Sequence, residues 1–235
     1  MLDTSRIKAI TLDLDDTLWP IQPVIERAEQ ALQDWLALHA PMTAALYSSH
    51  EAIDSIRRYV AESRPELRHN LSAVRRESIR LALYRAGENP LLANAAFEVF
   101  FSARQQVTLY DDALVALAFL SARFPLVALS NGNADIGRIG LGAYFCAAVH
   151  ASEFGSKKPD PQIFLAAVGA ASCQPGQVLH IGDDTVQDIL GAQNAGLQAV
   201  WLNRAGRDWE HPQAAPPQVQ GLEQLCDLLA VASVT

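Results

Sequence analysis

A short acidic sequence near the N-terminus ends the first predicted strand of the chain: Asp13-Leu14-Asp15-Asp16-Thr17-Leu18. It follows the apolar run Ile10-Thr11-Leu12, which is typical of a buried β-strand. Side chains two positions apart share one face of a strand, so Asp13 and Asp15 should project together as the chain leaves the sheet. Two carboxylates held close repel each other, unless they bind a divalent cation or share acid/base chemistry. An acidic turn without function is the alternative, because Asp also favours turns and helix caps.

The composition is that of a globular chain with no excess of positive charge. Its 235 residues, half of them hydrophobic, can form one α/β domain with a large insertion or two smaller domains. The formal net charge of −8 argues against nucleic-acid and membrane partners, which attract an excess of Lys and Arg. The three cysteines are isolated, no signal peptide is recognisable, and no apolar run approaches the roughly 20 residues of a membrane span. We therefore expect a cytoplasmic protein.

Residues 20–105 carry apolar side chains at intervals of three and four, the spacing of amphipathic helices. Four helices are predicted, over about residues 24–36, 43–64, 71–86 and 90–100. The segment is therefore expected to be an all-helical insertion, a small bundle. The basic stretch Arg75, Arg76 and Arg80 within it is predicted to be a solvated helix face, with a contact to an anionic substrate as the alternative.

From Asp111 onward, helical and strand patterns alternate, which predicts a parallel sheet with crossover helices. The predicted strands after the first cover residues 126–129, 147–150, 178–181 and 199–202. The predicted helices cover residues 113–123, 136–145, a segment from about 160, the segment containing Asp188, and 222–229. We predict an α/β fold, in which residues 1–19 and 106–235 form a Rossmann-like parallel-sheet core and residues 20–105 form an all-helical domain inserted after the first strand.

Polar clusters follow four of the predicted strands: Asp13 with Asp15, Ser130 with Asn131, Lys158 in a loop, and Asp183 with Asp184. The carboxyl ends of the strands in an open α/β sheet converge on one crevice, so these distant residues should become neighbours. Each cluster alone has an ordinary structural explanation as a cap, a turn or a solvated lysine. Together they supply a cation site beside a phosphate site.

The order of these motifs resembles that of the haloacid dehalogenase (HAD) superfamily, along nearly the whole chain. The four motifs of that family are DxDx[TV], a strand ending in Ser or Thr, a lysine often before Pro, and GDxxxxD or a variant. They match Asp13 through Thr17, Ser130, Lys158-Pro159, and Gly182-Asp183 through Asp188. The resemblance implies that the helical insertion is a cap domain, which one subclass of the family carries between its first and second motifs.

The residues and the resemblance together imply hydrolysis of a phosphate ester through an aspartyl-phosphate. Asp13 is the expected nucleophile, because an ionised carboxylate is available at neutral pH, and Asp15 is the expected acid and base. We expect Mg²⁺ to be bound by Asp13, Asp183 and the backbone carbonyl of Asp15. Phosphate should be bound by Lys158, Ser130 and the amide of Asn131. Thr17 and Asp188 are expected to support the site, Asp188 through Lys158 or the metal shell, and Asp184 is either an outer-shell group or a helix cap.

Other chemistries of the family depend on different residues. Haloacid dehalogenases lack an acid at the position of Asp15, because a leaving halide needs no proton, so Asp15 favours phosphate esters. Phosphonate-cleaving members need a cap lysine, and residues 20–105 contain none. Sugar phosphomutases remain an alternative. A receiver-like domain is a non-enzymatic alternative, since it also accepts phosphate on an Asp, but such domains are much shorter and lack a helical insertion.

A finer resemblance concerns the substrate. Segments such as Phe124–Asn133 and Leu179–Asp184 are similar to those of bacterial phosphatases that act on 5-amino-6-(5-phospho-D-ribitylamino)uracil and FMN in riboflavin synthesis. This implies a small phosphorylated metabolite as partner, with pyrimidine nucleotides or phosphoglycolate as alternative substrates. Trp19 follows the catalytic loop directly, and it either stacks on a flat substrate ring or anchors a hinge. Three further ring side chains are predicted to lie in the core: Trp35, His180 and Trp201.

Overall fold

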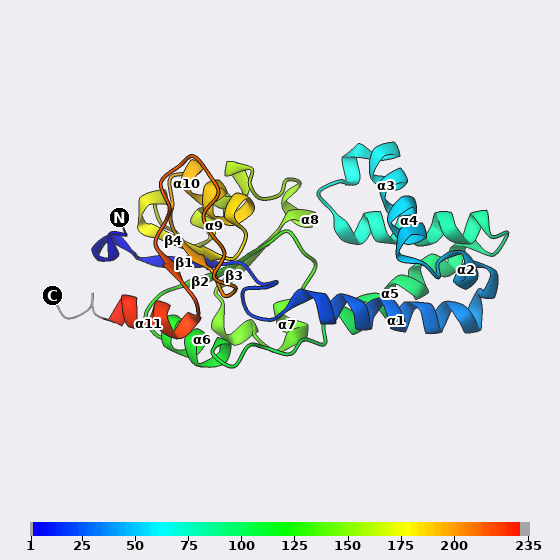
Figure 1. Cartoon of the computed structure of the whole chain (residues 1–235), viewed down its shortest axis with the longest axis horizontal. Coiled ribbons are helices and arrows are strands. Elements are labelled where there is room, and N and C mark those ends of the chain that lie inside the picture. The colour runs from blue at the N-terminus through cyan, green and yellow to red at the C-terminus, as the bar shows by residue number, and fades with distance from the viewer. Residues whose placement is uncertain (1, 231–235) are drawn as a thin grey trace. The chain divides into compact units, whose positions relative to one another are not determined.

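The computed structural model describes residues 2–230 of the chain, which divide into two compact units. One unit joins the N-terminal residues through Pro20 to the residues from Thr108 onward, and it contains a β-sheet. The other unit spans Ile21–Val107 and is built from helices. Figure 1 shows the elements of each unit. Among the described residues, no helix is both long and apolar enough to cross a lipid bilayer.

The first unit is organised around a parallel six-stranded sheet with the strand order β3-β2-β1-β4-β5-β6. Its strands are β1 (Ala9–Leu12), β2 (Leu126–Ser130), β3 (Ala147–His150), β4 (Val178–Gly182), β5 (Gln198–Leu202) and β6 (Gln218–Val219). The predicted α/β fold with a parallel sheet is confirmed. The sequence does not predict β6, because two residues are too few for a strand pattern to emerge.

Helices connect the strands and cover the sheet. They are α6 (Ala113–Ser121), α7 (Ile136–Ile139), α8 (Ala151–Phe154), α9 (Pro161–Ala170), the π-helical η6 (Thr185–Leu190), α10 (Gly191–Asn194) and α11 (Leu222–Ala230), with short 3-10 turns η1 (Thr4–Arg6), η4 (Gly142–Tyr144) and η5 (Pro175–Gln177). Every residue of β1, β2 and β4 is buried, as expected for parallel strands with both faces covered. Phe164 of α9 shares one hydrophobic cluster with Val127 and Leu129 of β2.

The strand order places three motif-bearing strands side by side. β1 lies between β2 and β4, and Ile10 is paired with Leu126 on one side and Leu179 on the other. Because the three strands are parallel, their carboxyl ends lie at the same edge of the sheet. The loop after β1, the last residue of β2 and the loop after β4 therefore meet at that edge.

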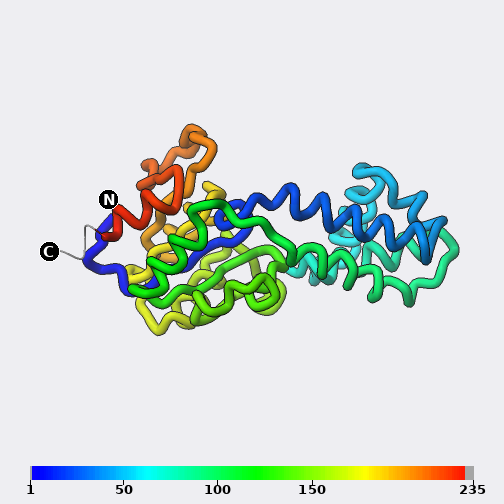
Figure 2. Tube along the Cα trace, turned by 90° about the horizontal axis from the view of Figure 1, so that it is seen from below, coloured from blue at the N-terminus to red at the C-terminus, as the bar shows by residue number. Residues whose placement is uncertain are grey.

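The second unit is a bundle of five α-helices: α1 (Ile21–His39), α2 (Pro41–Leu46), α3 (His50–Ser63), α4 (Leu71–Arg85) and α5 (Ala93–Arg104), with 3-10 turns η2 (Pro65–Leu67) and η3 (Pro90–Leu92). Helices α1 and α5 lie side by side (Figures 1 and 2). Their buried faces meet in one apolar cluster that includes Leu32, Leu36, Phe97 and Phe100. The apolar residues that recur at helical spacing in the sequence thus form a core within this unit.

Two predicted helices differ from the structure. The prediction of a single helix over residues 43–64 is wrong, because α2 ends at Leu46 and α3 begins at His50. Ser49 caps α3 by accepting a hydrogen bond from the Ala52 amide at 3.1 Å, which starts a new helix. The helix predicted over residues 136–145 is also wrong beyond α7, because Gly140 adopts a left-handed φ of 89° and ends it.

The prediction of a solvated basic face is wrong for Arg75. Its guanidinium binds the Glu29 carboxylate and lies 3.5 Å from the centre of the Phe100 ring. Periodicity counts Arg75 as a polar position, but a long side chain can reach a partner inside a bundle. This largely buried ion pair joins α4 to α1 within the helical unit.

Candidate active site

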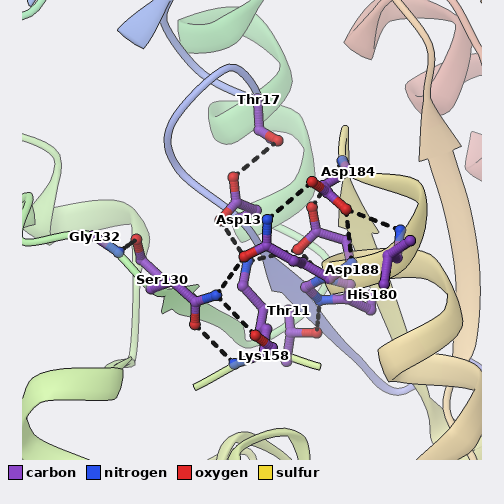
Figure 3. Close-up of polar contacts among 12 residues, drawn as sticks. Thr11, Asp13, Thr17, Ser130, Gly132, Lys158, His180, Asp184 and Asp188 are labelled. Carbon is purple, nitrogen blue, oxygen red and sulfur yellow. Dashed lines mark hydrogen bonds and ion pairs between the residues drawn. The ribbon is translucent and has the colours of Figure 1, made fainter. Parts of the chain in front are cut away.

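Lys158 lies at the centre of a buried cluster of carboxylates at the carboxyl edge of the sheet (Figure 3). Its Nζ donates to Asp13 Oδ1 at 2.5 Å and to Asp188 Oδ1 at 2.6 Å. Asp13 comes directly after β1, Lys158 lies in the loop before α9, and Asp188 belongs to η6. All three side chains are almost completely buried. The fold thus brings together three ionisable groups that lie far apart in the sequence.

Asp188 is the most completely hydrogen-bonded carboxylate of the cluster. Besides Lys158, its Oδ1 contacts His180 Nε2 at 3.2 Å, and the opposite ring nitrogen of His180 lies 2.8 Å from Thr11 Oγ1. Burial lowers the pKa of His180, so the ring is neutral at pH 7. A proton on Nε2 then serves Asp188, while Nδ1 accepts from the Thr11 hydroxyl. His180 is a core residue, as predicted, and it also orients Asp188.

The end of β4 leaves room for this carboxylate. A Cβ atom added at Gly182 would lie 2.3 Å from Asp188 Cγ, so any larger residue there would displace Asp188. The Asp184 amide donates to Asp188 Oδ2 at 3.0 Å. The glycine of the fourth motif is therefore explained by close packing against the last aspartate of the same motif.

Three carboxylates of the site lie close enough together to bind one cation. One oxygen each from Asp13, Asp183 and Asp188 lies within 4.8 Å of the other two. Carboxylate oxygens are the ligands that Mg²⁺ prefers in proteins. Asp188 already forms hydrogen bonds with Lys158, His180 and a backbone amide. Asp13 and Asp183 are therefore the carboxylates that best fit a hard divalent cation.

The pKa values follow from burial and crowded negative charge. Burial, with the charges of Asp188 and Asp16, raises the pKa of Asp183 to about 7. Burial also raises the pKa of Asp13 well above its usual range, although Lys158 opposes this. Although burial alone would raise the pKa of Asp188, Lys158 holds it below its usual range. The single ammonium of Lys158 leaves negative charge uncompensated, which a cation would relieve.

The Asn131 side chain holds the backbone of Lys158 in place. Its Oδ1 accepts from the Lys158 amide at 2.8 Å, and its Nδ2 donates to the Lys158 carbonyl at 3.0 Å and to Gln187 Oε1 at 2.7 Å. The sequence predicts only a phosphate contact for the Asn131 amide and assigns nothing to Gln187. A reciprocal pair of bonds across 27 positions leaves no local pattern in the sequence, so the bracing of Lys158 is not predictable from it.

Three other predicted residues take positions around the cluster. Thr17 Oγ1 donates to Asp13 Oδ2 at 3.4 Å, and Ser130 Oγ accepts from the Gly132 amide at 2.9 Å. Asp184 Oδ1 accepts from the Val186 and Gln187 amides at 2.9 and 2.7 Å, so it caps the start of η6. These contacts favour the helix-cap interpretation of Asp184.

Trp19 anchors the turn that carries the second aspartate of the motif. Its indole Nε1 donates to Asp15 Oδ1 at 2.9 Å, and its carbonyl accepts from the Asp16 amide at 2.8 Å. Asp16 adopts a left-handed φ of 58°, a conformation that Asp tolerates better than most residues. Trp19 is fully buried. Its contacts therefore favour an anchoring role over stacking on a substrate ring.

Side chains from residues 201–207 support the two loops that carry Thr17 and Asp183. Trp201 Nε1 and Arg207 Nη2 each donate to the Asp183 carbonyl at 2.9 Å. Arg204 Nη2 donates to the Thr17 carbonyl at 3.1 Å, and both of its Nη atoms bind Asp112 at 2.9 Å. The sequence predicts Trp201 only as a core residue and does not single out the two arginines, which belong to no motif.

The site residues enclose a pocket of about 180 Å³. It is lined by Asp13, Asp15, Asp16, Ser130, Asn131, Gly132, Lys158, Asp183, Asp184, Gln187 and Asp188. Carboxylates, an ammonium, a hydroxyl and amides surround one space, which suits a small polar group with bound cation rather than an apolar ligand.

The protein combines a parallel α/β sheet with an Asp-x-Asp loop, a buried lysine and an acidic cluster at the carboxyl edge of the sheet. These features define a class of hydrolases, and comparison with known proteins identifies the family. The chain belongs to the haloacid dehalogenase-like hydrolase family, whose model matches residues 7–196. This membership overturns the non-enzymatic receiver-like alternative.

Among the proteins of similar sequence are phosphatases that match nearly the whole chain. The 5-amino-6-(5-phospho-D-ribitylamino)uracil phosphatase YigB of Escherichia coli is 32% identical, over 95% of this chain and 97% of that protein. The phosphoserine phosphatase of Thermus thermophilus is 31% identical, over 89% and 94% of the two chains. Among solved structures, a 2-haloacid dehalogenase from Pseudomonas syringae has a TM-score of 0.90 and 39% identity, covering 96% of this chain and 99% of that one.

Proposed function

We propose that this protein is a Mg²⁺-dependent phosphomonoesterase that acts through an aspartyl-phosphate on Asp13. The observation that carries the proposal is the convergence in one pocket of Asp13, Lys158 and Asp183, with Asp15 in the same lining. The family and its phosphatase relatives support hydrolysis of phosphoric monoesters. We further propose that the helical unit serves as a cap, as in the family subclass that the sequence resembles.

In this proposal each residue has a separate task. An Asp13 oxygen attacks phosphorus while the bond from phosphorus to the ester oxygen breaks, and Asp15 gives its proton to the leaving alkoxide. Asp15 then takes a proton from the water that attacks the aspartyl-phosphate, which releases inorganic phosphate and restores Asp13. Lys158 and Ser130 hold the phosphoryl oxygens. Mg²⁺, when held by Asp13, Asp183 and the Asp15 carbonyl, supplies charge that offsets the repulsion between carboxylate and phosphate.

Dehalogenation is the second candidate, because the similar Pseudomonas syringae structure is described as a 2-haloacid dehalogenase. A halide leaves without a proton, whereas an alkoxide needs one, so Asp15 favours the phosphate ester. The test compares p-nitrophenyl phosphate, with Mg²⁺ or with EDTA, against 2-chloropropionate. We expect phosphate release that EDTA abolishes and Mg²⁺ restores, with no chloride release. Chloride release without phosphate release would overturn the proposal.

For the substrate, we propose 5-amino-6-(5-phospho-D-ribitylamino)uracil or FMN, on the similarity to the Escherichia coli relative. The relatives also include a phosphoserine phosphatase and a glyceraldehyde 3-phosphate phosphatase, so smaller phosphate esters are alternative substrates. Ranking kcat/KM over these compounds, pyrimidine nucleotides and phosphoglycolate tests the proposal. The ribityl compounds should rank first by at least about tenfold, which is about 1.4 kcal/mol of transition-state stabilisation.

Replacing Asp15 by Asn should trap the phosphorylated protein. The leaving group loses its acid and the water loses its base, so we expect kcat to fall by roughly 10²-fold or more. The second step should slow more than the first when the leaving group is p-nitrophenolate, which needs little protonation. Intact-protein mass spectrometry after brief exposure to this substrate should show one added phosphoryl group, mapped to Asp13.

Asp16→Asn is the matched control for this trap, because Asn also tolerates the left-handed φ of Asp16. Asp16 lines the same pocket, so the variant removes a charge there without removing the proposed acid, and it should accumulate no adduct. An Asp15→Asn protein that turns over at the wild-type rate would exclude Asp15 from proton transfer.

Mg²⁺ affinity should depend on pH through Asp183, whose pKa is raised to about 7. Below that pH a proton competes with the cation. The association constant for Mg²⁺ should therefore increase by up to about tenfold per unit of rising pH and level off above pH 7.

The metal-free folded protein also binds more protons than the unfolded chain between about pH 4 and 7, so its stability should fall as the pH rises through this window. Titration calorimetry and thermal unfolding measure the two effects, and Asp183→Asn should reduce both, while the raised pKa of Asp13 accounts for the remainder. An unchanged pH profile in Asp183→Asn would assign the effect elsewhere.

A further inference from the structure

The side-chain amide of Gln187 joins two of the loops that form the catalytic pocket. Gln187 belongs to η6, is exposed and lines the pocket. Its Oε1 accepts from Asn131 Nδ2 at 2.7 Å, and its Nε2 donates to Asp184 Oδ2 at 2.9 Å. Asn131 follows β2 and Asp184 follows β4, and β1 lies between these two strands in the sheet. The Gln187 bridge, from Asn131 through Gln187 to Asp184, therefore connects loops whose strands are not neighbours.

The orientation of both amides in the bridge follows from groups that can act in only one way. Asn131 Oδ1 faces the Lys158 amide, which is a donor, so Nδ2 faces the Lys158 carbonyl. Nδ2 has a second N–H to donate, and Gln187 Oε1 accepts it. The other end of the Gln187 amide is a donor, and it meets a carboxylate oxygen of Asp184. Turning either amide would set like groups against each other, so the bridge has a single arrangement.

Both ends of the bridge lead to Lys158. At one end, Asn131 binds the Lys158 backbone through both the amide and the carbonyl. At the other end, the Asp184 amide donates to Asp188 Oδ2 at 3.0 Å, and Asp188 Oδ1 accepts from the Lys158 ammonium at 2.6 Å. The hydrogen bonds thus close a ring that starts and ends at Lys158. Gln187 is its exposed member, and without Gln187 the ring is open.

The bridge also links the loop proposed to hold phosphoryl oxygens to the loop proposed to hold the cation. Ser130 directly precedes Asn131, and Asp183 directly precedes Asp184. Attack on phosphorus needs these groups at a fixed separation, because a displacement of about 1 Å can cost roughly 10²-fold in rate. A side chain that is bonded to the neighbours of both groups limits such a displacement.

We propose that Gln187 is a positioning residue, which fixes Asn131 and, through Asn131, the Lys158 that binds the phosphoryl group. The inference rests on the proposed phosphatase function, because it gives Gln187 a part in that reaction. The alternative is a contact local to η6, since Gln and Asp three positions apart on a helix often form a hydrogen bond. A local contact would affect η6 alone, whereas the Gln187 bridge must affect Lys158.

The first test needs no turnover. Gln187→Met keeps the length of the side chain and removes both hydrogen bonds of the bridge. The Lys158 amide, which donates to Asn131 Oδ1, should then exchange its hydrogen with solvent at least about fivefold faster, because local opening becomes easier. The Leu129 amide in β2 should exchange at an unchanged rate. NMR of the full-length protein measures both rates, and the melting temperature should change by less than about 2 °C, because Gln187 is exposed.

The second test measures hydrolysis of p-nitrophenyl phosphate with Mg²⁺. The kcat of Gln187→Met should fall by about tenfold while KM stays within about threefold, since the charge of Lys158 remains but fits the transition state less well. In an Asn131→Ala protein the same change should lower kcat by less than about twofold, because Gln187 acts through Asn131. Gln193→Met is the matched control, because Gln193 is exposed on α10 and lies outside the pocket lining. It should change neither the exchange rates nor kcat.

The outcomes separate this inference from the proposed function. If the wild type is active, an unchanged Lys158 exchange rate in Gln187→Met, or faster exchange with a wild-type kcat, would overturn the inference and leave the phosphatase function standing. A full tenfold loss in the Asn131→Ala background would place the effect of Gln187 on another contact, which also overturns it. A wild type that hydrolyses no ester would overturn the proposed function and the catalytic role of Gln187 together, while the exchange rates would still decide whether Gln187 holds Lys158.

Discussion

Replacing Asp13 by Asn is expected to abolish turnover, with kcat reduced by roughly 10⁴-fold or more, because the amide cannot form the acyl-phosphate bond. Phosphate release from p-nitrophenyl phosphate measures the loss. The variant should also fail to take up phosphate, so mass spectrometry should show no adduct even when Asp15→Asn is added. Appreciable residual turnover would remove Asp13 as the nucleophile.

Stability should move in the opposite direction to activity in this variant. Burial raises the pKa of Asp13 well above its usual range, so the ionised carboxylate is costly in the metal-free fold. An Asn side chain carries no charge and still offers an oxygen to the Lys158 ammonium, which lies 2.5 Å from Asp13 Oδ1. We therefore expect the melting temperature of metal-free Asp13→Asn at pH 7 to equal or exceed that of the wild type. A large drop would indicate that the loss of activity comes from unfolding.

The parts of this site that the sequence predicts are those that follow a strand. Asp13 and Ser130 lie at the ends of short apolar runs, and parallel strands carry their ends to one edge. Lys158 is predictable only from the order of the motifs, since a lone lysine in a loop is usually solvated. Its burial at 2% exposure is a tertiary fact that no local pattern contains.

The parts that the sequence misses are contacts between side chains of different elements. Arg204 reaches the Thr17 carbonyl across 187 positions, and Trp201 reaches the Asp183 carbonyl from β5. Both residues follow the last motif, and both lie beyond residues 7–196, the stretch that the family model matches. The sequence places Arg75 in solvent, because polar residues at helical spacing usually face water, yet Arg75 binds Glu29. Charge pairs inside a helical bundle are exceptions to that rule, and this one joins α4 to α1.

Replacing Lys158 by Met should cost both activity and stability. Lys158 is the only cation bound to Asp13 and Asp188 among the residues that the structure describes, and Met keeps the length of the side chain without its charge. Two buried carboxylates would then face each other unpaired, a defect that costs about 3 kcal/mol or more. For a domain of this size we expect the metal-free melting temperature to fall by roughly 6 °C or more. Loss of the charge at the phosphoryl group should lower kcat by roughly 10²- to 10³-fold.

The adjacent lysine provides the control, because Lys157 is exposed and Lys157→Met changes the same charge at the same place in the chain. It should leave kcat and melting temperature almost unchanged. Adding Asp188→Asn to Lys158→Met should recover part of the lost stability, since it removes one of the two unpaired charges, but none of the activity. If Lys158→Met melts at the wild-type temperature, the two carboxylates are not held by Lys158, and the electrostatic account of the site is wrong. If stability falls but turnover is kept, Lys158 is a structural cation and the phosphate contact must come from another residue.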